Sequence, residues 1–201
     1  MIRIIGKIPP KVTIACSGGI DSMVFTHFLL QGRREVELAY FNHDTKHGKD
    51  AEDYMNQFAE KNELKLHIGR VNGVKGKRSM EEFWRDERYA FFNTLDSDFI
   101  ITCHHLDDCV ETWIMSSFHG FGKVIPYQRS GGIHRPFLMT EKRSIKRYAK
   151  NHEVDWIEDP SNSGAHYMRN YVRKYIVPHA LKVNPGLRKT LRKKLLQLYV
   201  K

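Results

Sequence analysis

The first half of the chain alternates between short apolar segments and longer amphipathic ones. The apolar segments are rich in β-branched and aromatic residues, which predicts strands at residues 11–16, 36–43, 64–71 and 98–105. The segments between them predict helices at residues 21–32, 49–62 and 79–95. This order indicates parallel strands joined by right-handed helical crossovers, so we expect an α/β doubly wound, mostly parallel sheet. Sheets of this kind bind ligands outside the carboxyl ends of their strands.

The second half of the chain shows fewer strand patterns. Residues 118–133 are rich in glycine and turn-forming residues and predict a loop. Helical patterns follow over residues 140–153, where Thr140 is suited to cap the helix, and over residues 185–201, which predict a basic amphipathic helix. The chain therefore changes character after the predicted α/β part.

The length of 201 residues and the hydrophobic content of 41% are sufficient for one large domain with an appendage. We expect an α/β core over residues 1–139. The helical extension over residues 140–201 is then expected to supply a wall of the site and a basic surface.

The charge of the chain favours a polyanionic partner. The 33 Lys and Arg residues exceed the 23 Asp and Glu residues, which gives a formal net charge of +10. Nucleic acid is the leading candidate for the partner, and improved solubility is the alternative explanation of the charge. Basic residues gather in several short runs, namely RRE, VKGKR, EKRSIKR, RNYVRK and RKTLRKK.

The three cysteines, Cys16, Cys103 and Cys109, are widely separated and form no CxxC pair. This spacing favours neither a disulfide framework nor a zinc or iron–sulfur site. No segment predicts a signal peptide or a membrane span, and we expect a cytoplasmic protein without membrane contact.

Residues 17–22, with the sequence SGGIDS, lie where the first predicted strand meets the first predicted helix. The two glycines permit positive φ and leave backbone N–H groups bare, so that these groups can converge on phosphate oxygens at the helix N-terminus. Asp21 would repel phosphate and is better suited to hold Mg²⁺. A plain turn is the alternative, but the position after the first strand favours a phosphate site. The expected nucleotide-binding residues are Ser17, Gly18, Gly19, Ile20, Asp21 and Ser22.

The segment HHLDDCVET, residues 104–112, follows the last predicted strand. If a helix starts near Leu106, Asp107 and Glu111 share one helical face. Two carboxylates on one face repel each other mildly unless a cation or a donor lies between them. Metal binding or contact with a base would relieve this repulsion, and ordinary acidic decoration of a helix N-terminus is the alternative.

Two further segments carry polar residues suited to a site. Arg85 and Arg88 lie one helical turn apart, which suits a phosphate, although a solvated helix face paired with nearby acids is the alternative. The second segment, residues 159–173, places polar side chains on a turn and on the helix that follows. The candidates there are Asp159, Asn162, Arg169, Asn170 and Arg173.

SGGIDS resembles the PP-loop of the ATP pyrophosphatase superfamily, and HHLDDCVET resembles the HHxDDxxET element of the tRNA(Ile)-lysidine synthetase family. Three further windows are similar to that family, namely FNHDTKHGKDAEDYMNQFAEK, SMEEFWRDERYAFF and IEDPSNSGAHYMRNYVRKYIVP. Together these windows span residues 16–178 in the order that the family shows. Cys109 departs from the glutamine that is common at its position.

The resemblance implies an enzyme that uses ATP and Mg²⁺, adenylates C2 of the wobble cytidine in a CAU anticodon, and joins L-lysine to that carbon. The implied partners are an isoleucine tRNA and free lysine. The implied catalytic residues are Asp21, Arg85, His105, Asp107 and Asp108. The implied RNA or substrate contacts are Arg88, Glu111, Asp159, Asn162, Arg169, Asn170 and Arg173.

Two other functions stay open at this point. One is a PP-loop tRNA thiolase, although the CxxC cysteines typical of that group are absent, and the other is a non-catalytic RNA-binding protein. Many members of the family carry further domains after this core, so the true RNA substrate stays open as well. The same is true of the oligomeric state, a homodimer included.

Overall fold

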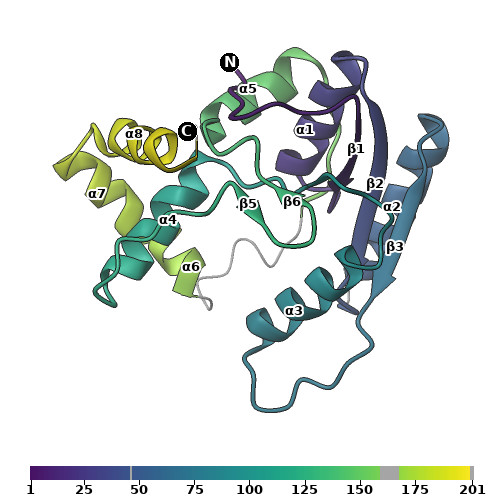
Figure 1. Ribbon diagram of the computed structural model, residues 1–201, viewed down its shortest axis with the longest axis horizontal. Helices are drawn as coiled ribbons and strands as arrows, with labels where there is room; N and C mark the ends of the chain where they lie inside the picture. The colour runs from purple at the N-terminus through teal and green to yellow at the C-terminus, as the bar shows by residue number, and fades with distance from the viewer. Residues whose placement is uncertain (46, 159–167, 200–201) are drawn as a thin grey trace.

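A computed structural model describes residues 1–45, 47–158 and 168–199. Its centre is a six-stranded sheet with the order β3-β2-β1-β4-β6-β5 (Figure 1). All neighbouring strands run parallel except β5, which is antiparallel to β6. The strands are β1 (Lys11–Ala15), β2 (Glu35–Asn42), β3 (Leu66–Arg70), β4 (Ile100–Ile101), β5 (Gln128–Arg129) and β6 (Ile133–His134). The predicted mostly parallel α/β sheet is confirmed.

Helices cover both faces of the sheet. The helices α1 (Ile20–Gln31) and α2 (Gly48–Lys61) pack on one face, and α3 (Met80–Phe92) packs on the other. The alternation of side chains along a strand creates the two faces, since Ile101 joins the α1 cluster and Ile100 joins the α3 cluster. The sheet is therefore doubly wound, as predicted.

The last predicted strand, residues 98–105, is much shorter than expected. Only Ile100 and Ile101 pair with β1 and β6, and the residues on either side add a bond each, from the N–H of Thr13 to the carbonyl of Phe99 and from the N–H of Thr102 to the carbonyl of His134. His105 is already the cap of the next helix. The chain leaves the sheet here because the neighbouring strands β1 and β6 also end, and the freed residues enter the site described below.

The glycine-rich loop prediction for residues 118–133 missed a hairpin. Strands β5 and β6 are two residues each, and their turn contains Gly131 and Gly132, with φ of 78° and 66°. A residue with a Cβ is strained at such positive φ values, which explains the paired glycines. Strands this short carry no periodicity that a sequence pattern can detect.

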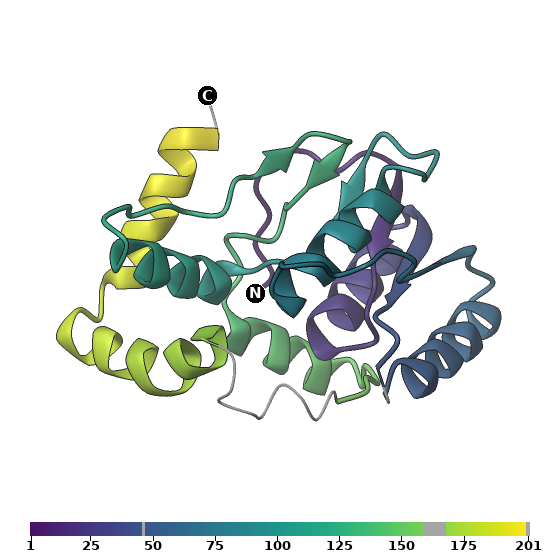
Figure 2. The ribbon, with the colours of Figure 1, turned by 90° about the horizontal axis from the view of Figure 1, so that it is seen from below.

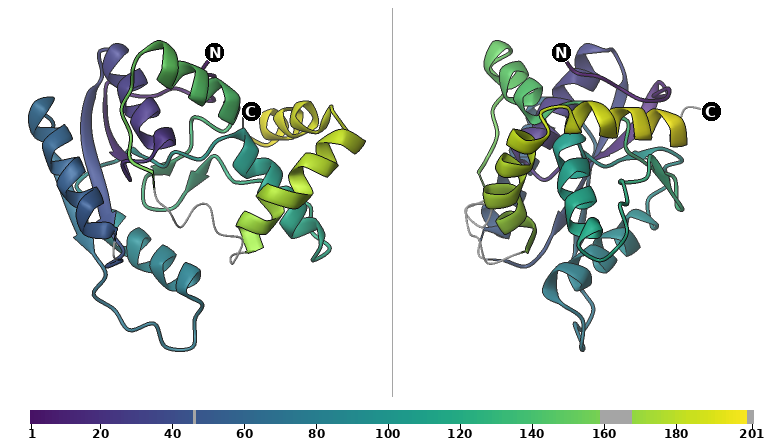
Figure 3. Two further views of the ribbon diagram at one scale, coloured as in Figure 1. Left: turned by 180° about the vertical axis from the view of Figure 1, so that it is seen from behind. Right: turned by 90° about the vertical axis from the view of Figure 1, so that its left-hand side faces the viewer.

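The remaining helices form a second packed group. They are α4 (Leu106–Ser117), α5 (Lys142–Asn151), α6 (Met168–Tyr171), the π-helical turn η2 (Val172–Ile176), α7 (Val177–Val183) and α8 (Leu187–Tyr199). Helices α7 and α8 lie against α4 (Figure 3), and their apolar side chains share one hydrophobic cluster. Pro178, in the first turn of α7, has no N–H to donate to the preceding turn, and the wide turn η2 comes directly before it.

Helix α5 lies beside α1 on the same side of the sheet as α2 (Figure 2). Its Ile145 and Ala149 belong to the same hydrophobic cluster as β1 and α1. The predicted cap at Thr140 is wrong, because the cap residue is Glu141. Thr140 is buried instead and exchanges hydrogen bonds with the backbone of Arg3, at 2.9 and 2.7 Å.

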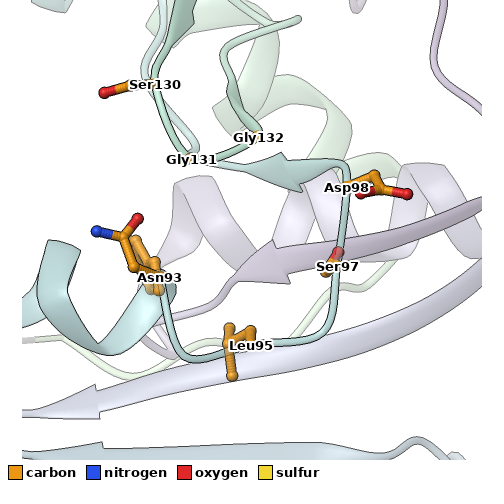
Figure 4. Close-up of a pocket in the computed structure, with 8 residues that line it drawn as sticks. Asn93, Leu95, Ser97, Asp98, Ser130, Gly131 and Gly132 are labelled. Carbon is orange, nitrogen blue, oxygen red and sulfur yellow. The ribbon is translucent and has the colours of Figure 1, made fainter.

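A cavity of about 560 Å³ opens at the amino ends of β4 and β6 (Figure 4). Its lining includes Asn93 after α3, Asp98 before β4, and the β5–β6 turn. It lies at the opposite end of the strands from the PP-loop segment. None of the helices that the structure describes is long and apolar enough to cross a membrane.

Candidate functional site

Residues 17–22 form a compact turn between β1 and α1. Gly18 has φ of 79°, and Gly19 caps α1 without a side-chain hydrogen bond to the first turn. The hydroxyl of Ser22 accepts a bond from the N–H of Ser17 at 3.1 Å and donates one to the carbonyl of Gly19 at 2.9 Å. The serine therefore braces the turn from inside, while the amides at the start of α1 have no side-chain cap and suit an anion.

An extended segment before residue 159 lies against this turn. The N–H of Ile157 donates to the carbonyl of Gly18 at 2.9 Å, and a Cβ on Gly18 would come within 2.9 Å of the Ile157 side chain. The glycine is thus required both by its backbone angle and by this close approach.

Asp21 points toward two cationic groups from other elements. Its carboxylate oxygens accept bonds from Nζ of Lys142 at 2.6 and 2.7 Å, and Nε2 of His105 lies 3.6 Å away. Burial alone would raise the pKa of Asp21, but the bond and charge of His105 and the ammonium of Lys142 outweigh it and lower the pKa to about 2. Asp21 is therefore a carboxylate at neutral pH.

His105 is buried at the start of α4, which begins at Leu106 as the sequence predicts. A capping box fixes its position. The backbone N–H of His105 donates to the Asp108 carboxylate at 2.9 Å, and Nδ1 of His105 accepts from the backbone N–H of Asp108 at 3.4 Å. Burial would lower the pKa of His105, but the carboxylates of Asp108 and Asp21 outweigh burial and raise it. The imidazole thus links the PP-loop turn to α4.

Two acids of α4, Asp107 and Glu111, bind side chains and backbone groups from different parts of the chain. Asp107 accepts bonds from the N–H of Lys142 at 2.7 Å and from Arg188 at 2.6 Å. Glu111 instead receives two bonds from Arg173, at 2.6 and 2.9 Å. Asp107 and Glu111 therefore have different partners, because α8 and the first residue of α5 reach Asp107 while η2 reaches Glu111.

Arg173 joins Asp108 to Glu111, which lie one helical turn apart. Its second contact, to Asp108, is 3.4 Å long. Burial raises the pKa of Glu111 despite the guanidinium. The cation that relieves the repulsion between these α4 carboxylates is an arginine of the chain itself.

Arg85 and Arg88 lie beside the ring of Tyr89 on α3, with guanidinium carbons 5.8 Å from the ring centre in both cases. Two arginines from the β5–β6 hairpin complete the group. Arg129 stacks over the same ring at 4.1 Å, and Arg135 donates to the Tyr89 hydroxyl at 3.1 Å. We call these four arginines and Tyr89 the Tyr89 cluster.

The acids of α3 do not neutralise its arginines. Asp86 pairs with Arg78 at 3.0 Å, and Glu87 accepts bonds from the N–H groups of Asn72 and Gly73. Among the described residues, neither Arg85 nor Arg88 forms the local ion pairs of the alternative interpretation, although Arg85 is exposed as that interpretation expects.

The structure brings most of the predicted residues to the carboxyl ends of the strands. Arg169 donates to Thr112 of α4 at 3.2 Å, next to the Arg173 contacts, and Asn170 is half-buried on α6. Asp159 and Asn162 lie outside the described residues. Sequence reasoning missed Lys142, Arg188, Arg129 and Arg135. Lys142 stands inside the basic run EKRSIKR, where nothing in the pattern separates it from solvated neighbours.

A Mg²⁺ ion at this site would have one carboxylate ligand from the chain, Asp21. Within residues 1–45, 47–158 and 168–199, no group of three or more His, Cys, Asp or Glu side chains could hold a metal ion. Mg²⁺ needs few protein ligands when it is shared with substrate phosphates, and a single ionised Asp21 beside the PP-loop turn fits that mode of binding. Lys142 holds both oxygens of Asp21 and would have to give up at least one.

Comparisons with known proteins agree with this geometry. The family model for the PP-loop domain matches residues 5–180. The tRNA(Ile)-lysidine synthase of Persephonella marina is 33% identical over 90% of this chain and 44% of its own length. That of Exiguobacterium sibiricum is 32% identical over 86% of this chain and 44% of its own length. The chain spans less than half the length of these curated relatives.

Among solved structures, the U34-tRNA thiolase NcsA from Methanococcus maripaludis superposes with a TM-score of 0.76 at 19% sequence identity, over 94% of this chain and 72% of NcsA. At this identity the likeness shows the fold. The predicted resemblance to tRNA(Ile)-lysidine synthetases is confirmed by the curated relatives. Since the family model matches residues 5–180, which is most of its length, this chain belongs to the PP-loop domain family.

Proposed function

We propose that the chain catalyses the ATP-dependent attachment of lysine to a wobble cytidine, as a tRNA(Ile)-lysidine synthase. The relatives carry that name, and the observation that carries the proposal is the contact chain Lys142–Asp21–His105–Asp108 beside the PP-loop turn. The substrates are ATP, free L-lysine and an isoleucine tRNA with a CAU anticodon.

The reaction has two steps that balance without a further reactant. The C2 carbonyl oxygen of cytosine attacks the α-phosphorus of ATP, and pyrophosphate leaves. The ε-amine of lysine then attacks C2, the bond from C2 to the adenylate oxygen breaks, AMP leaves, and the amine releases its protons to a base.

We propose that the PP-loop turn holds the phosphates in the first step. Gly18, Gly19, Ile20 and Ser22 offer backbone N–H groups at the positive end of α1, where preorganised donors stabilise the negative charge that develops, whereas the N–H of Ser17 is bonded to Ser22. Asp21 would hold Mg²⁺, which when bound neutralises phosphate charge.

The second step needs a lysine amine without its extra proton, although the pKa of a free lysine side chain is about 10.4. We propose that His105, Asp107 and Asp108 form the environment that accepts this proton. Burial would raise the pKa of Asp108, but the charge and the backbone N–H of His105 outweigh burial and lower it, so Asp108 is ionised. Substrate contacts are proposed for Glu111, Asp159, Asn162, Arg169, Asn170 and Arg173.

The cysteine at the site favours this proposal over sulfur transfer. The Cys103 thiol donates to the carbonyl of Ala15 at 3.4 Å, and burial raises its pKa well above the usual range. A thiol held in its protonated form is a poor nucleophile. This favours the lysidine reaction over a thiolase reaction that would use Cys103.

One assay tests the proposal. The protein is incubated with ATP, Mg²⁺, labelled lysine and tRNA with a CAU anticodon, and lysine on the RNA, AMP and pyrophosphate are measured. We expect one AMP and one pyrophosphate for each lysine attached, and none with a GAU anticodon, which lacks the wobble cytidine. Sulfur incorporation, or RNA binding without AMP release, would each contradict the proposal.

A further inference from the structure

The Tyr89 cluster concentrates positive charge in one place. Its four guanidinium groups come from two elements, since Arg85 and Arg88 lie on α3 while Arg129 and Arg135 belong to the β5–β6 hairpin. No ion pair to any of them is formed within the part of the chain that the structure describes. Elsewhere several arginines form ion pairs with carboxylates, including Arg173, Arg188 and Arg192.

Burial makes this unpaired charge costly. Arg135 is only 3% exposed, and although it donates to Tyr89 and to the carbonyl of Pro126, its buried Nε has no partner among the described residues. The buried Nε of Arg169 is in the same state. Buried donors without acceptors and cations without counter-charges are unfavourable, so the arrangement is expected where an anion completes it.

The neighbouring titratable groups respond to this field. Burial, and then the cations of Arg135, Arg88 and Arg169, outweigh Asp108 and lower the pKa of His104 to about 3. Burial also lowers the pKa of Arg88, and among its charged neighbours Arg85, Arg135 and Arg169 act in the same direction. These arginines lie on three elements, namely α3, the β5–β6 hairpin and α6. Their positive charges therefore lie close together beside His104.

We propose that the Tyr89 cluster, together with Arg169, is a second anion site that binds a backbone phosphate of the RNA strand next to the modified nucleotide. The proposal rests on the proposed function for the identity of the RNA. The planar fork of arginine pairs with two phosphate oxygens at once, and several forks around one ring can hold one phosphodiester from different sides.

The position of the cluster separates it from the nucleotide phosphates. The PP-loop turn opens α1, on one face of the sheet, whereas Tyr89 packs on the opposite face with Ile100 and Ile133. His104 lies beside the cluster and the adjacent His105 contacts Asp21, so a base between the two sites would have ATP on one side and its own backbone on the other. Arg85 is exposed, which leaves a path for the rest of the strand.

The test compares RNA binding and ATP binding in the full chain. Arg85→Gln, at an exposed position, and Arg129→Gln, which removes the stacked guanidinium, are measured by fluorescence anisotropy with a labelled CAU anticodon stem-loop between about 50 and 200 mM KCl. We expect each variant to bind the RNA about tenfold more weakly. We also expect the slope of log K against log salt to fall by about 0.7 for each lost contact to a single-stranded phosphate.

A measurement of ATP affinity shows whether the Tyr89 cluster binds a phosphate of RNA or a phosphate of ATP. If the cluster holds RNA, both variants keep the affinity of the wild type for ATP, measured by calorimetry with Mg-ATP alone. An equal loss of ATP affinity would place the nucleotide phosphates at the cluster and overturn the proposal. Arg33→Gln is the control, because Arg33 is exposed in the turn before β2 at the opposite end of the strands, and we expect its salt slope to equal that of the wild type.

The remaining outcomes distinguish this proposal from the proposed function. If the wild type attaches no lysine but both variants lose RNA affinity, the reaction is wrong and the anion site stands. If the wild type attaches lysine and both variants bind RNA with unchanged affinity and slope, the anion site alone is wrong. A wild type that binds no RNA overturns it as well. Arg129→Lys, which keeps the charge, is expected to recover part of the affinity and most of the slope.

Discussion

The two sides of the site are built in different ways. The PP-loop turn is held by bonds within six residues, from Ser22 to Ser17 and Gly19. The acids of α4 are held by partners far along the chain, since Lys142 lies 35 residues from Asp107, and Arg173 lies 62 residues from Glu111. A local turn forms from its own sequence, whereas the α4 side exists only when the C-terminal helices have packed.

The largest effect is expected from Asp21→Asn. The amide keeps the size of the side chain and removes the charge that Lys142, His105 and Mg²⁺ would share, so ATP-dependent release of pyrophosphate should fall by at least about 100-fold. The fold should stay intact, because the turn is braced by Ser22, but the melting temperature should fall because the variant loses the ion pair to Lys142. Unchanged turnover would show that the local side of the site does not hold the reacting phosphates.

A large effect on stability is expected from Arg173→Met, which leaves Glu111 buried without its counter-charge. Because Arg173 itself is partly exposed, we expect a loss of about 2 kcal/mol in the free energy of unfolding, less than for a fully buried pair. The pKa of Glu111 is already raised and should rise further. Protonation of Glu111 then favours the folded variant at low pH, and this contribution is lost as the pH rises through the folded pKa.

Urea unfolding at pH 5 and pH 8 measures this effect, with the larger loss expected at pH 8. The double variant Arg173→Met with Glu111→Gln is the control, since it removes the buried charge and should recover part of the stability. An equal loss at both pH values would contradict the assignment of Glu111 as a buried carboxylate.

A smaller effect is expected from Ser22→Ala. The variant loses both internal bonds of the turn, which should cost about 1–2 kcal/mol of stability and weaken ATP binding several-fold. Ser17→Ala is the matched control, because the exposed Ser17 hydroxyl makes only a 3.4 Å contact to Ser22. If the two variants behave alike, the bracing by Ser22 is not what shapes the turn.

The smallest effect, and the sharpest for the comparison, is expected from Lys142→Met. Removing the ammonium frees Asp21, so the Mg²⁺ concentration for half-maximal ATP binding should fall a few-fold. The pKa of Asp21, lowered to about 2 in the wild type, should move back toward 3.8. The charge that stabilises the folded state is lost as the pH falls through the folded pKa, so acid unfolding should begin at a higher pH in the variant. A higher Mg²⁺ requirement would instead show that Lys142 supports metal binding.

The same contrast between local and distant contacts decided what the sequence could predict. The alternation of strands and helices in the first half of the chain, the helix α4 from Leu106, and the SGGIDS turn follow from patterns a few residues long, and they are confirmed in the fold. The partners of Asp107 and Glu111 could not be predicted, because helical spacing places side chains on a helix but not the helices that pack around it. The Tyr89 cluster could not be predicted either. Arg129 and Arg135 reach Tyr89 through β5 and β6, and strands of two residues leave no pattern in the sequence.

The contact between Gly18 and Ile157 has a consequence for synthesis of the protein. Gly18 is synthesised long before Ile157, whose N–H donates to the Gly18 carbonyl. Lys142, the partner of Asp21, is also made long after the turn. The turn can therefore form early in synthesis, but it gains its contacts to Lys142 and Ile157 only after residue 157 has been made.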